Sequence, residues 1–401
     1  MTVEPLWAPF DPANVSDPYL MYRRLRNQHP VYKAQTGEFI VSRYNDVRAI
    51  LKSSGFRSGN RLEWLSRGIE YFRNHDEDLS NIYRAINSFI LFLNAPDHTA
   101  IRNFVSKTWD HRNVASMIES VVDERLDQLS GTFDAVRDFA QPIPAIVICR
   151  IMGIPLKDYD YIRALGVKMV RSLDLYHSWK DLVELNDTSA AFVTYFEHLI
   201  SAKSDNSDEG LLSKLIAANQ KEKLLTKEQL VSIAIFLFVA GEETTANSIG
   251  SAIHDFATTG NYRHLKQDAE TLRTTGIEEF FRYNGPVQLL GRIARSEITI
   301  AGTTIPAESA ITLIVASANR DESQFTDADR MDIKRNPNPH LAFGYGTHFC
   351  LGEWLGKLQT RIAIERFFAK FNEVEIADQK IEWQRNISVR GMKSLIVNTR
   401  Q

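Results

Sequence analysis

Ten residues decide how this 401-residue chain folds: Phe343-Gly344-Tyr345-Gly346-Thr347-His348-Phe349-Cys350-Leu351-Gly352. They stand directly before an amphipathic stretch, residues 353–371, whose apolar spacing predicts a helix. A cysteine just ahead of a helix meets backbone N–H groups and the positive end of the helix dipole, which favour the metal-binding thiolate. Gly346 and Gly352 let the backbone approach the sulfur and a flat ligand, and Phe343 can shield the sulfur from water. The segment therefore predicts a cysteine thiolate that binds a metal.

The kind of metal site follows from what surrounds Cys350 in the sequence. No neighbouring Cys or His set could complete a tetrahedral site, which argues against zinc and iron–sulfur clusters and favours an axial thiolate on haem. The pattern Phe343-x-x-Gly346-x-His348-x-Cys350-x-Gly352 resembles the haem-binding signature of the cytochrome P450 superfamily at every fixed position. The alternative is a buried, inert cysteine in a glycine-rich turn.

This resemblance covers nearly the whole chain and looks like the soluble bacterial branch of the superfamily. It implies a mainly α fold with a minor β region, a long central helix over haem, and small sheets near the N-terminus and after residue 295. No internal repeat, low-complexity tract or linker interrupts the sequence, so we expect a single domain over residues 1–401. Its β-rich part is expected at about residues 28–45 and 295–316, and the remainder is expected to be helical.

A long buried helix is predicted in the middle of the chain. Thr226-Lys227-Glu228-Gln229 is a capping-box pattern that opens a helix running to about Thr258. Residues 233–240 are apolar on every side of this helix and are expected to be buried all round. Directly after them, Ala240-Gly241-Glu242-Glu243-Thr244-Thr245 places polar residues where an apolar helix has no structural use for them, which suggests function.

The resemblance implies that Glu243 and Thr244 are the acid–alcohol pair that delivers protons to dioxygen, and that Ala240 and Gly241 contact the cofactor. Glu242 points in a different direction from its neighbour and is expected to lie off the oxygen path. The alternative is a helix with a glycine kink and a surface pair of glutamates.

Other cofactor-binding and structural residues also come from the resemblance. Glu279 and Arg282 are spaced to meet on one helical face, a spacing that is common on solvated helices, and the family makes them structural together with Arg330. Haem carries two propionates, which need cationic or hydrogen-bonding partners when buried. The propionate partners that the resemblance implies are His98, Arg102, Arg292 and His348. The alternative for each of these four, taken singly, is a surface charge or an ordinary capped histidine.

The substrate pocket is expected to be an apolar cavity on the side of haem opposite Cys350. Residues 58–92 should cover it, with aromatic and arginine side chains that would suit an apolar substrate carrying an anionic group, unless they only pack on each other. The candidate lining residues by family position are Val239, Ala240, Gln288, Leu289, Ile387 and Ser388.

Composition limits the partners of the protein. A net charge of −3 and a pI near 6.4 give no general attraction to nucleic acid or to an anionic membrane. The N-terminus shows no signal or anchor pattern, so we expect a cytoplasmic protein, and a monomer. Two cysteines in a long chain do not suggest disulfides, and Cys149, in an apolar run, is interpreted as a core residue.

The activity expected from these residues is a haem-dependent monooxygenase reaction on a small lipophilic molecule with O2. Because the chain has no flavin or iron–sulfur signature, electrons must come from outside, and the resemblance implies a ferredoxin and its reductase as their source. An acidic ferredoxin could dock where cations flank the cysteine segment, although a plain solvated face is an equal reading; these cations are Lys334, Arg335, Lys357 and Arg361. Oxidative coupling at the same iron and a non-catalytic haem sensor are the alternatives.

Overall fold

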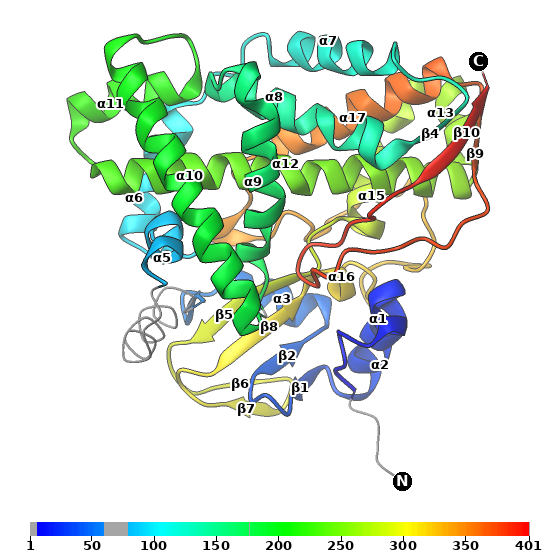
Figure 1. Ribbon diagram of the computed structural model, residues 1–401. Helices are drawn as coiled ribbons and strands as arrows, with labels where there is room; N and C mark the ends of the chain where they lie inside the picture. The colour runs from blue at the N-terminus through cyan, green and yellow to red at the C-terminus, as the bar shows by residue number, and fades with distance from the viewer. Residues whose placement is uncertain (1–5, 60–78, 176, 401) are drawn as a thin grey trace. The chain divides into compact units, whose positions relative to one another are not determined.

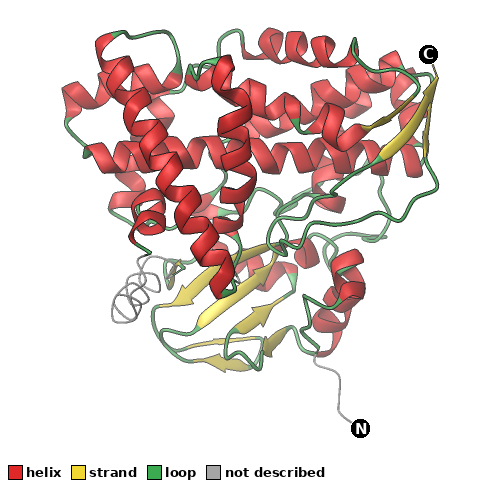
Figure 2. Ribbon diagram, in the orientation of Figure 1, coloured by secondary structure: helices red, strands yellow, loops and turns green. Residues whose placement is uncertain are grey.

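Helices make up most of the chain, and the strands are short (Figures 1 and 2). The computed structural model describes residues 6–59, 79–175 and 177–400. It divides into a sheet unit, residues 1–57, 118–143 and 244–401, and a helical unit, residues 58–117 and 144–243. Helices α7 (Val114–Leu126), α8 (Pro142–Met152) and α12 (Lys227–Thr258) run from one unit into the other. The prediction of a single domain stays a prediction.

The sheet unit holds the strands and the helices that frame them. Its strands are β1 (Val31–Lys33), β2 (Phe39–Val41), β3 (Phe56–Ser58, whose last residue belongs to the helical unit), β4 (Thr132–Asp134), β5 (Leu289–Ala294), β6 (Ile298–Ile300), β7 (Thr303–Ile305), β8 (Ala310–Ile314), β9 (Glu373–Ile376) and β10 (Ile396–Arg400). Its α-helices are α1 (Pro12–Ser16), α2 (Tyr19–Gln28), α3 (Tyr44–Lys52), α13 (Asn261–Gln267), α14 (Ala269–Thr271), α15 (Ile277–Asn284), α16 (Val315–Ala318) and α17 (Glu353–Lys370). Wider or tighter helical turns cover residues 135–140, 272–276 and 346–348.

The main sheet has five strands in the order β1-β2-β8-β5-β3. Strand β2 pairs in parallel with β8, with Ile40 opposite Thr312, whereas β5 pairs with β8 antiparallel. Helix α3 places Tyr44, Val47 and Leu51 on one buried face, and these side chains join the apolar core of the sheet. This packing positions the end of α3, which contacts the cysteine loop described below.

A second sheet, β4-β10-β9, has three strands, and β6 and β7 form a two-stranded ribbon. Val397 of β10 lies opposite Phe133 of β4 and Ile376 of β9. The mainly α fold with small sheets is confirmed, but the sequence did not reveal this second sheet. Its strands of three to five residues come from distant parts of the chain, and such short runs carry little periodic signal.

The described part of the helical unit contains α5 (Ser80–Ile86), α6 (Asp97–Thr108), α9 (Tyr159–Met169), α10 (Trp179–Asp205) and α11 (Leu211–Glu222), with short helical turns at residues 156–158 and 170–173. Helix α10 runs beside α9 and also packs on α5 and α11 (Figure 1). Ser178 and Asp181 form a reciprocal capping box at its start. Buried Phe192 and Phe196 stack on its inner face, with ring centroids 6.0 Å apart.

Helix α12 is the long helix that the capping-box pattern predicts. Thr226 N donates to Gln229 Oε1 at 2.9 Å, and Gln229 N donates back to Thr226 Oγ1 at 3.2 Å. Its 32 residues correspond to about 48 Å of helix. Among the described residues it is the one helix long and apolar enough to cross a membrane, and 72% of its most apolar window is buried inside the protein. Of residues 233–240, all are buried except Phe236 and Ala240, which are partly buried, so α12 is a core helix that is not buried on every side.

Candidate active site

The segment around Cys350 forms a tight loop that ends at the start of α17. Cys350 N donates to the Phe343 carbonyl oxygen at 2.9 Å, which closes the loop. Gly344 and Gly346 have φ angles of +74° and +75°, a backbone region that favours glycine. A Cβ on Gly346 would lie 2.6 Å from the Leu51 carbonyl oxygen, so this glycine also lets the loop press against α3. The two glycines therefore fix where the cysteine side chain stands.

The two cysteines of the chain have different environments. Cys350 is exposed and lies two residues before Gly352, the N-cap of the 18-residue helix α17. The helix dipole at that end stabilises a thiolate. Cys149 is buried within α8, and burial raises the pKa of its thiol to about 12. The interpretation of Cys149 as a core residue is confirmed, and Cys350 is the cysteine suited to bind a metal.

Phe343 is held in an aromatic and cationic environment at the other end of the loop. Its ring centroid lies 4.7 Å from that of Phe281 and 6.1 Å from that of His340. Lys357 Nζ lies 5.1 Å from the ring centroid. The ammonium is itself fixed by Glu278, 2.7 Å from Lys357 Nζ, which also accepts from His340 Nε2 at 2.9 Å if that nitrogen carries the proton. Phe343 is therefore fixed in place before any ligand binds.

Arg292 supplies a test of whether haem fits the residues present. It lies on β5, is only 6% exposed, and burial lowers the pKa of its guanidinium to about 10. Nη1 donates to the Gly291 carbonyl oxygen at 2.7 Å, and no carboxylate within the described chain forms an ion pair with it. A buried cation without an anionic partner is costly, so the site suits a bound anion such as a propionate. An exposed thiol and a buried guanidinium together fit haem.

The centre of α12 carries the predicted acid–alcohol pair. Glu242 and Glu243 are both buried, and Thr244, partly buried, accepts at its carbonyl oxygen from Ser248 Oγ at 2.9 Å. A Cβ on Gly241 would lie 3.2 Å from Ile148 Cδ1 on α8. The absent side chain at Gly241 thus allows close packing of α12 on α8. Contact of Ala240 and Gly241 with the cofactor stays a prediction.

The remaining predicted propionate partners lie on two different elements. His98 and Arg102 stand one turn apart on α6, with His98 buried and Arg102 partly buried. His348 ends the short helical turn at residues 346–348, within the cysteine loop. Their roles toward haem stay predictions.

Comparisons with known proteins identify the family. The cytochrome P450 family model matches residues 271–394. The biotin biosynthesis cytochrome P450 of Bacillus subtilis is 32% identical over 394 residues, covering 96% of both chains. The chain belongs to the cytochrome P450 family.

Further relatives agree in sequence and in structure. The polyketide biosynthesis cytochrome P450 PksS of Bacillus subtilis is 30% identical over 95% of this chain and 96% of its own. The crystal structure of P450BioI in complex with hexadec-9Z-enoic acid ligated acyl carrier protein superposes with a TM-score of 0.88. That structure is 29% identical in sequence and covers 97% of this chain and 99% of the other. This P450 is therefore an oxidoreductase of the monooxygenase family, whose members use haem with a thiolate ligand and O2.

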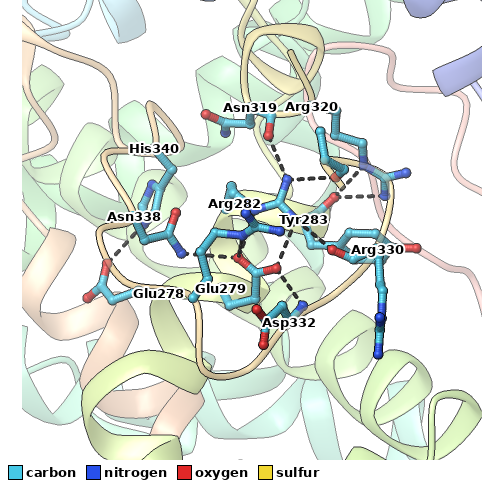
Figure 3. A network of polar contacts seen from close by, with 12 residues as sticks. Glu278, Glu279, Arg282, Tyr283, Asn319, Arg320, Arg330, Asp332, Asn338 and His340 are labelled. Carbon is cyan, nitrogen blue, oxygen red and sulfur yellow. Dashed lines mark hydrogen bonds and ion pairs between the residues drawn. The ribbon is translucent and has the colours of Figure 1, made fainter. Parts of the chain in front are cut away.

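A buried polar network joins α15 of the P450 to the long connection that precedes the cysteine loop (Figure 3). Glu279 and Arg282 are fully buried, and Arg282 Nε and Nη2 donate to the Glu279 carboxylate at 2.7 and 2.8 Å. Arg282 Nη1 donates to the carbonyl oxygens of Asn319 and Ala328, both at 2.8 Å. Asp332 N donates to Glu279 Oε1 at 2.7 Å. The pair is structural, as predicted, because it ties the connection to the helix.

Two side chains of the connection reach Glu279, those of Arg335 and Asn338, whereas the predicted Arg330 joins the network through its carbonyl oxygen. Arg335 Nε lies 3.1 Å from Glu279 Oε2. Arg330 is exposed and contributes only its carbonyl oxygen, which accepts from Arg282 Nη2 at 3.0 Å. Sequence reasoning missed Arg335 because the connection turns between these two arginines, and no spacing rule applies to contacts 56 residues apart.

The cations predicted to receive a ferredoxin are mostly engaged within the protein. Lys357 Nζ lies 2.7 Å from Glu278 Oε1 and 2.5 Å from Glu353 Oε1. Arg361 Nη1 lies 3.2 Å from Glu365 Oε2, and Arg335 is bound to Glu279. Lys334 is exposed and has no ion pair in the described part of the chain. The positive surface around the loop is thus weaker than the count of lysines and arginines suggests.

The predicted pocket residues fall into two groups. Gln288 N donates to the Ser388 carbonyl oxygen at 2.9 Å, so residues 288–289 lie beside residues 387–388. Leu289 and the Gln288 side chain are buried there. Val239 and Ala240 belong to α12, in the helical unit. The cover was predicted over residues 58–92, of which residues 60–78 lie outside the described residues, and its role stays a prediction.

Proposed function

We propose that this P450 inserts one oxygen atom from O2 into a small lipophilic substrate, with haem b held by the Cys350 thiolate. The observation that carries the proposal is the position of Cys350, exposed at the end of a loop fixed by glycines and just before the N-terminus of α17. When bound, haem supplies the oxidising chemistry that activates O2. The protein supplies binding, orientation and protons.

Each proposed site residue has its own task. Arg292, His98, Arg102 and His348 hold the propionates by charge and hydrogen bonds. Phe343 shields the sulfur from water, because its ring is already fixed by Phe281 and Lys357. Glu243 holds a proton in the interior of α12, and Thr244 positions its hydroxyl to pass a proton to the reacting oxygen. The remaining candidates shape the space for the substrate; they are Val239, Ala240, Gln288, Leu289, Ile387 and Ser388.

The decisive experiment is a spectrum. The purified protein is reduced, carbon monoxide is added, and the Soret band is recorded. We expect the strongly red-shifted band of thiolate-bound haem. A histidine-type band, or a protein that stays colourless after haemin is supplied, contradicts the proposal.

Thr244→Ala tests proton delivery. The variant should consume NADPH at a rate close to that of the wild type but divert electrons to peroxide, lowering product per NADPH by about tenfold or more, because proton-transfer groups contribute at least that much. The assay uses a surrogate ferredoxin, its reductase and NADPH. Thr245→Ala is the matched control, since Thr245 is the neighbouring buried threonine. Unchanged coupling in Thr244→Ala removes Thr244 from this role.

For the substrate we propose an acyl or polyketide chain carried on a protein. Two relatives are named for biotin and polyketide biosynthesis, and a similar P450 was crystallised with an acyl-loaded carrier protein. A carrier-bound C16 acyl chain should displace the iron-bound water and shift the resting Soret band at a lower concentration than the free fatty acid. An equal shift by the free acid contradicts carrier dependence.

Electrons come, in this proposal, from a ferredoxin and a reductase, and the protein works as a cytoplasmic monomer. Helix α12 is the one apolar helix of membrane length in the described part of the chain, and its burial supports a core role. Oxidative coupling at the same haem is the second candidate, and product analysis with the identified substrate separates it from hydroxylation. A non-catalytic sensor is disfavoured by the pair of buried Glu243 and partly buried Thr244, because a haem binder does not need proton delivery.

A further inference from the structure

A second acid lies inside α12, and the proposed reaction does not yet use it. Glu242 is 2% exposed, and its Oε1 lies 3.8 Å from Arg163 Nε on α9. Its other carboxyl oxygen, Oε2, is buried and has no hydrogen-bond partner in the described part of the protein. A buried polar atom without a partner costs free energy, so it calls for a functional explanation.

Helix α9 is shaped around this carboxyl group. A Cβ on Gly166 would collide with Glu242 Oε2 and would lie 2.9 Å from Phe238 Cε1. Glycine inside a helix costs about 1 kcal/mol relative to alanine. Gly166 lies in the interior of α9, outside the positive-φ positions, so its backbone does not require glycine. The space that its missing side chain leaves is taken by the Glu242 carboxyl group.

The charged and titratable groups that face Glu242 come from three helices. Arg163 approaches from α9, the Cys149 thiol from α8, and Glu243 is its neighbour on α12. Burial, and then the charge of Glu243, raise the pKa of Glu242 well above its usual range, and Arg163 opposes them only in part. The Arg163 side chain is 28% exposed and so connects this interior group with the solvent.

We propose that Glu242 stores a proton inside α12 and passes it to Glu243, and that Glu242 is then reprotonated from the solvent along the Arg163 side chain. The proton leaves the Glu242 carboxyl group and binds the Glu243 carboxylate, and the Glu242 carboxylate then takes a proton from a hydronium ion of the solvent, which becomes water; no electrons move. Glu242 and Glu243 are neighbours in α12, about 100° apart around the helix axis. Glu242 acts through Glu243 and is thus a positioning residue. This inference rests on the proposed function, since it supplies the same protons.

Glu242→Gln in the haem-loaded protein tests this inference, because glutamine keeps the size of the side chain and cannot exchange the proton. The variant should show the same carbon monoxide band as the wild type and a severalfold lower product per NADPH. In the wild type, coupling should fall as pH rises through the pKa of Glu242, whereas in the variant it should be low and independent of pH. Glu222→Gln, at an exposed glutamate ending α11, is the control and should match the wild type.

Two measurements do not depend on turnover. Infrared difference spectra recorded while pH is raised should show loss of a protonated carboxyl band in the wild type and not in Glu242→Gln. A carboxyl group whose pKa is raised by folding holds more protons in the folded state, so its contribution to the unfolding free energy falls as pH rises. The melting temperature of Glu242→Gln, measured relative to that of the wild type, should therefore increase as pH rises above about 4.3, the usual pKa of glutamate.

The outcomes separate this inference from the proposed function. If the thiolate band is present but Glu242→Gln keeps the coupling and pH profile of the wild type, the proton store is refuted and the proposed function stands. If the thiolate band is missing in the wild type, the proposed function itself is refuted, whatever Glu242→Gln shows. If Glu242→Gln does not fold, Gly166→Ala replaces it, because the added methyl group displaces the same carboxyl group and should also lower coupling. Normal coupling in Gly166→Ala overturns the inference. So does the lack of a titrating infrared band in the wild type.

Discussion

Replacing Cys350 with histidine should convert the carbon monoxide band of the reduced protein from the thiolate type to the histidine type and lower turnover to background. The loop geometry supports this expectation, because Cys350 N is bound to the Phe343 carbonyl oxygen and the side chain is exposed at the start of α17. The axial ligand sets the electronic character of haem iron, and a neutral imidazole lacks the electron donation of a thiolate. The loss of turnover should reach about a thousandfold or more, because the reaction depends on that ligand.

Cys149→Ala is the matched control for Cys350→His. Cys149 is fully buried in α8, and burial raises the pKa of its thiol to about 12, so it offers no thiolate at neutral pH. The control should keep the thiolate band and lose about 1 kcal/mol of stability through the small cavity. Both visible spectra are recorded on reduced, carbon monoxide-treated protein. A thiolate band that survives in Cys350→His, or disappears in Cys149→Ala, would falsify the ligand assignment.

The sequence predicted best where a local rule applies. The start of α12 follows from Thr226 and Gln229, whose side chains cap each other's backbone N–H groups within one turn. The loop at Cys350 follows from its glycines, two of which, Gly344 and Gly346, adopt the left-handed backbone that glycine favours. In each case the residues that decide the structure are close together in the chain, so their pattern can be read directly.

Contacts between distant segments were predicted less well. The pairing of β10 with β4 joins segments that stand more than 250 residues apart, and Gly241 faces Ile148 on α8, which no local pattern reveals. Charged side chains show the same limit. Lys357 looks like a free cation in the sequence but is paired with Glu278 and Glu353 in the fold. The same limit led to the choice of Arg330, since the partners of Glu279 depend on how the connection turns.

Arg282→Ala should destabilise the protein by about 3–5 kcal/mol, because it removes one member of a fully buried ion pair and leaves the Glu279 carboxylate uncompensated. The guanidinium also holds the carbonyl oxygens of Asn319, Ala328 and Arg330, so their hydrogen bonds are lost together. These carbonyl oxygens belong to the connection that leads to the cysteine loop. We therefore expect reduced haem loading as well as a lower unfolding midpoint in denaturant, followed by tryptophan fluorescence.

Two further arginine variants test which side chain completes the network. Arg335→Ala should cost about 1.5–3 kcal/mol, the usual worth of hydrogen bonds to a charged group, because Arg335 Nε binds Glu279 and its Nη1 binds the Thr326 carbonyl oxygen. Arg330→Ala should change stability by no more than about 0.5 kcal/mol, because the exposed Arg330 side chain takes no part and its carbonyl oxygen is kept. The three variants should thus rank Arg282, Arg335, Arg330 in decreasing cost. An Arg330→Ala cost equal to that of Arg335→Ala would contradict this ranking and give the Arg330 side chain, and not only its carbonyl oxygen, a structural role.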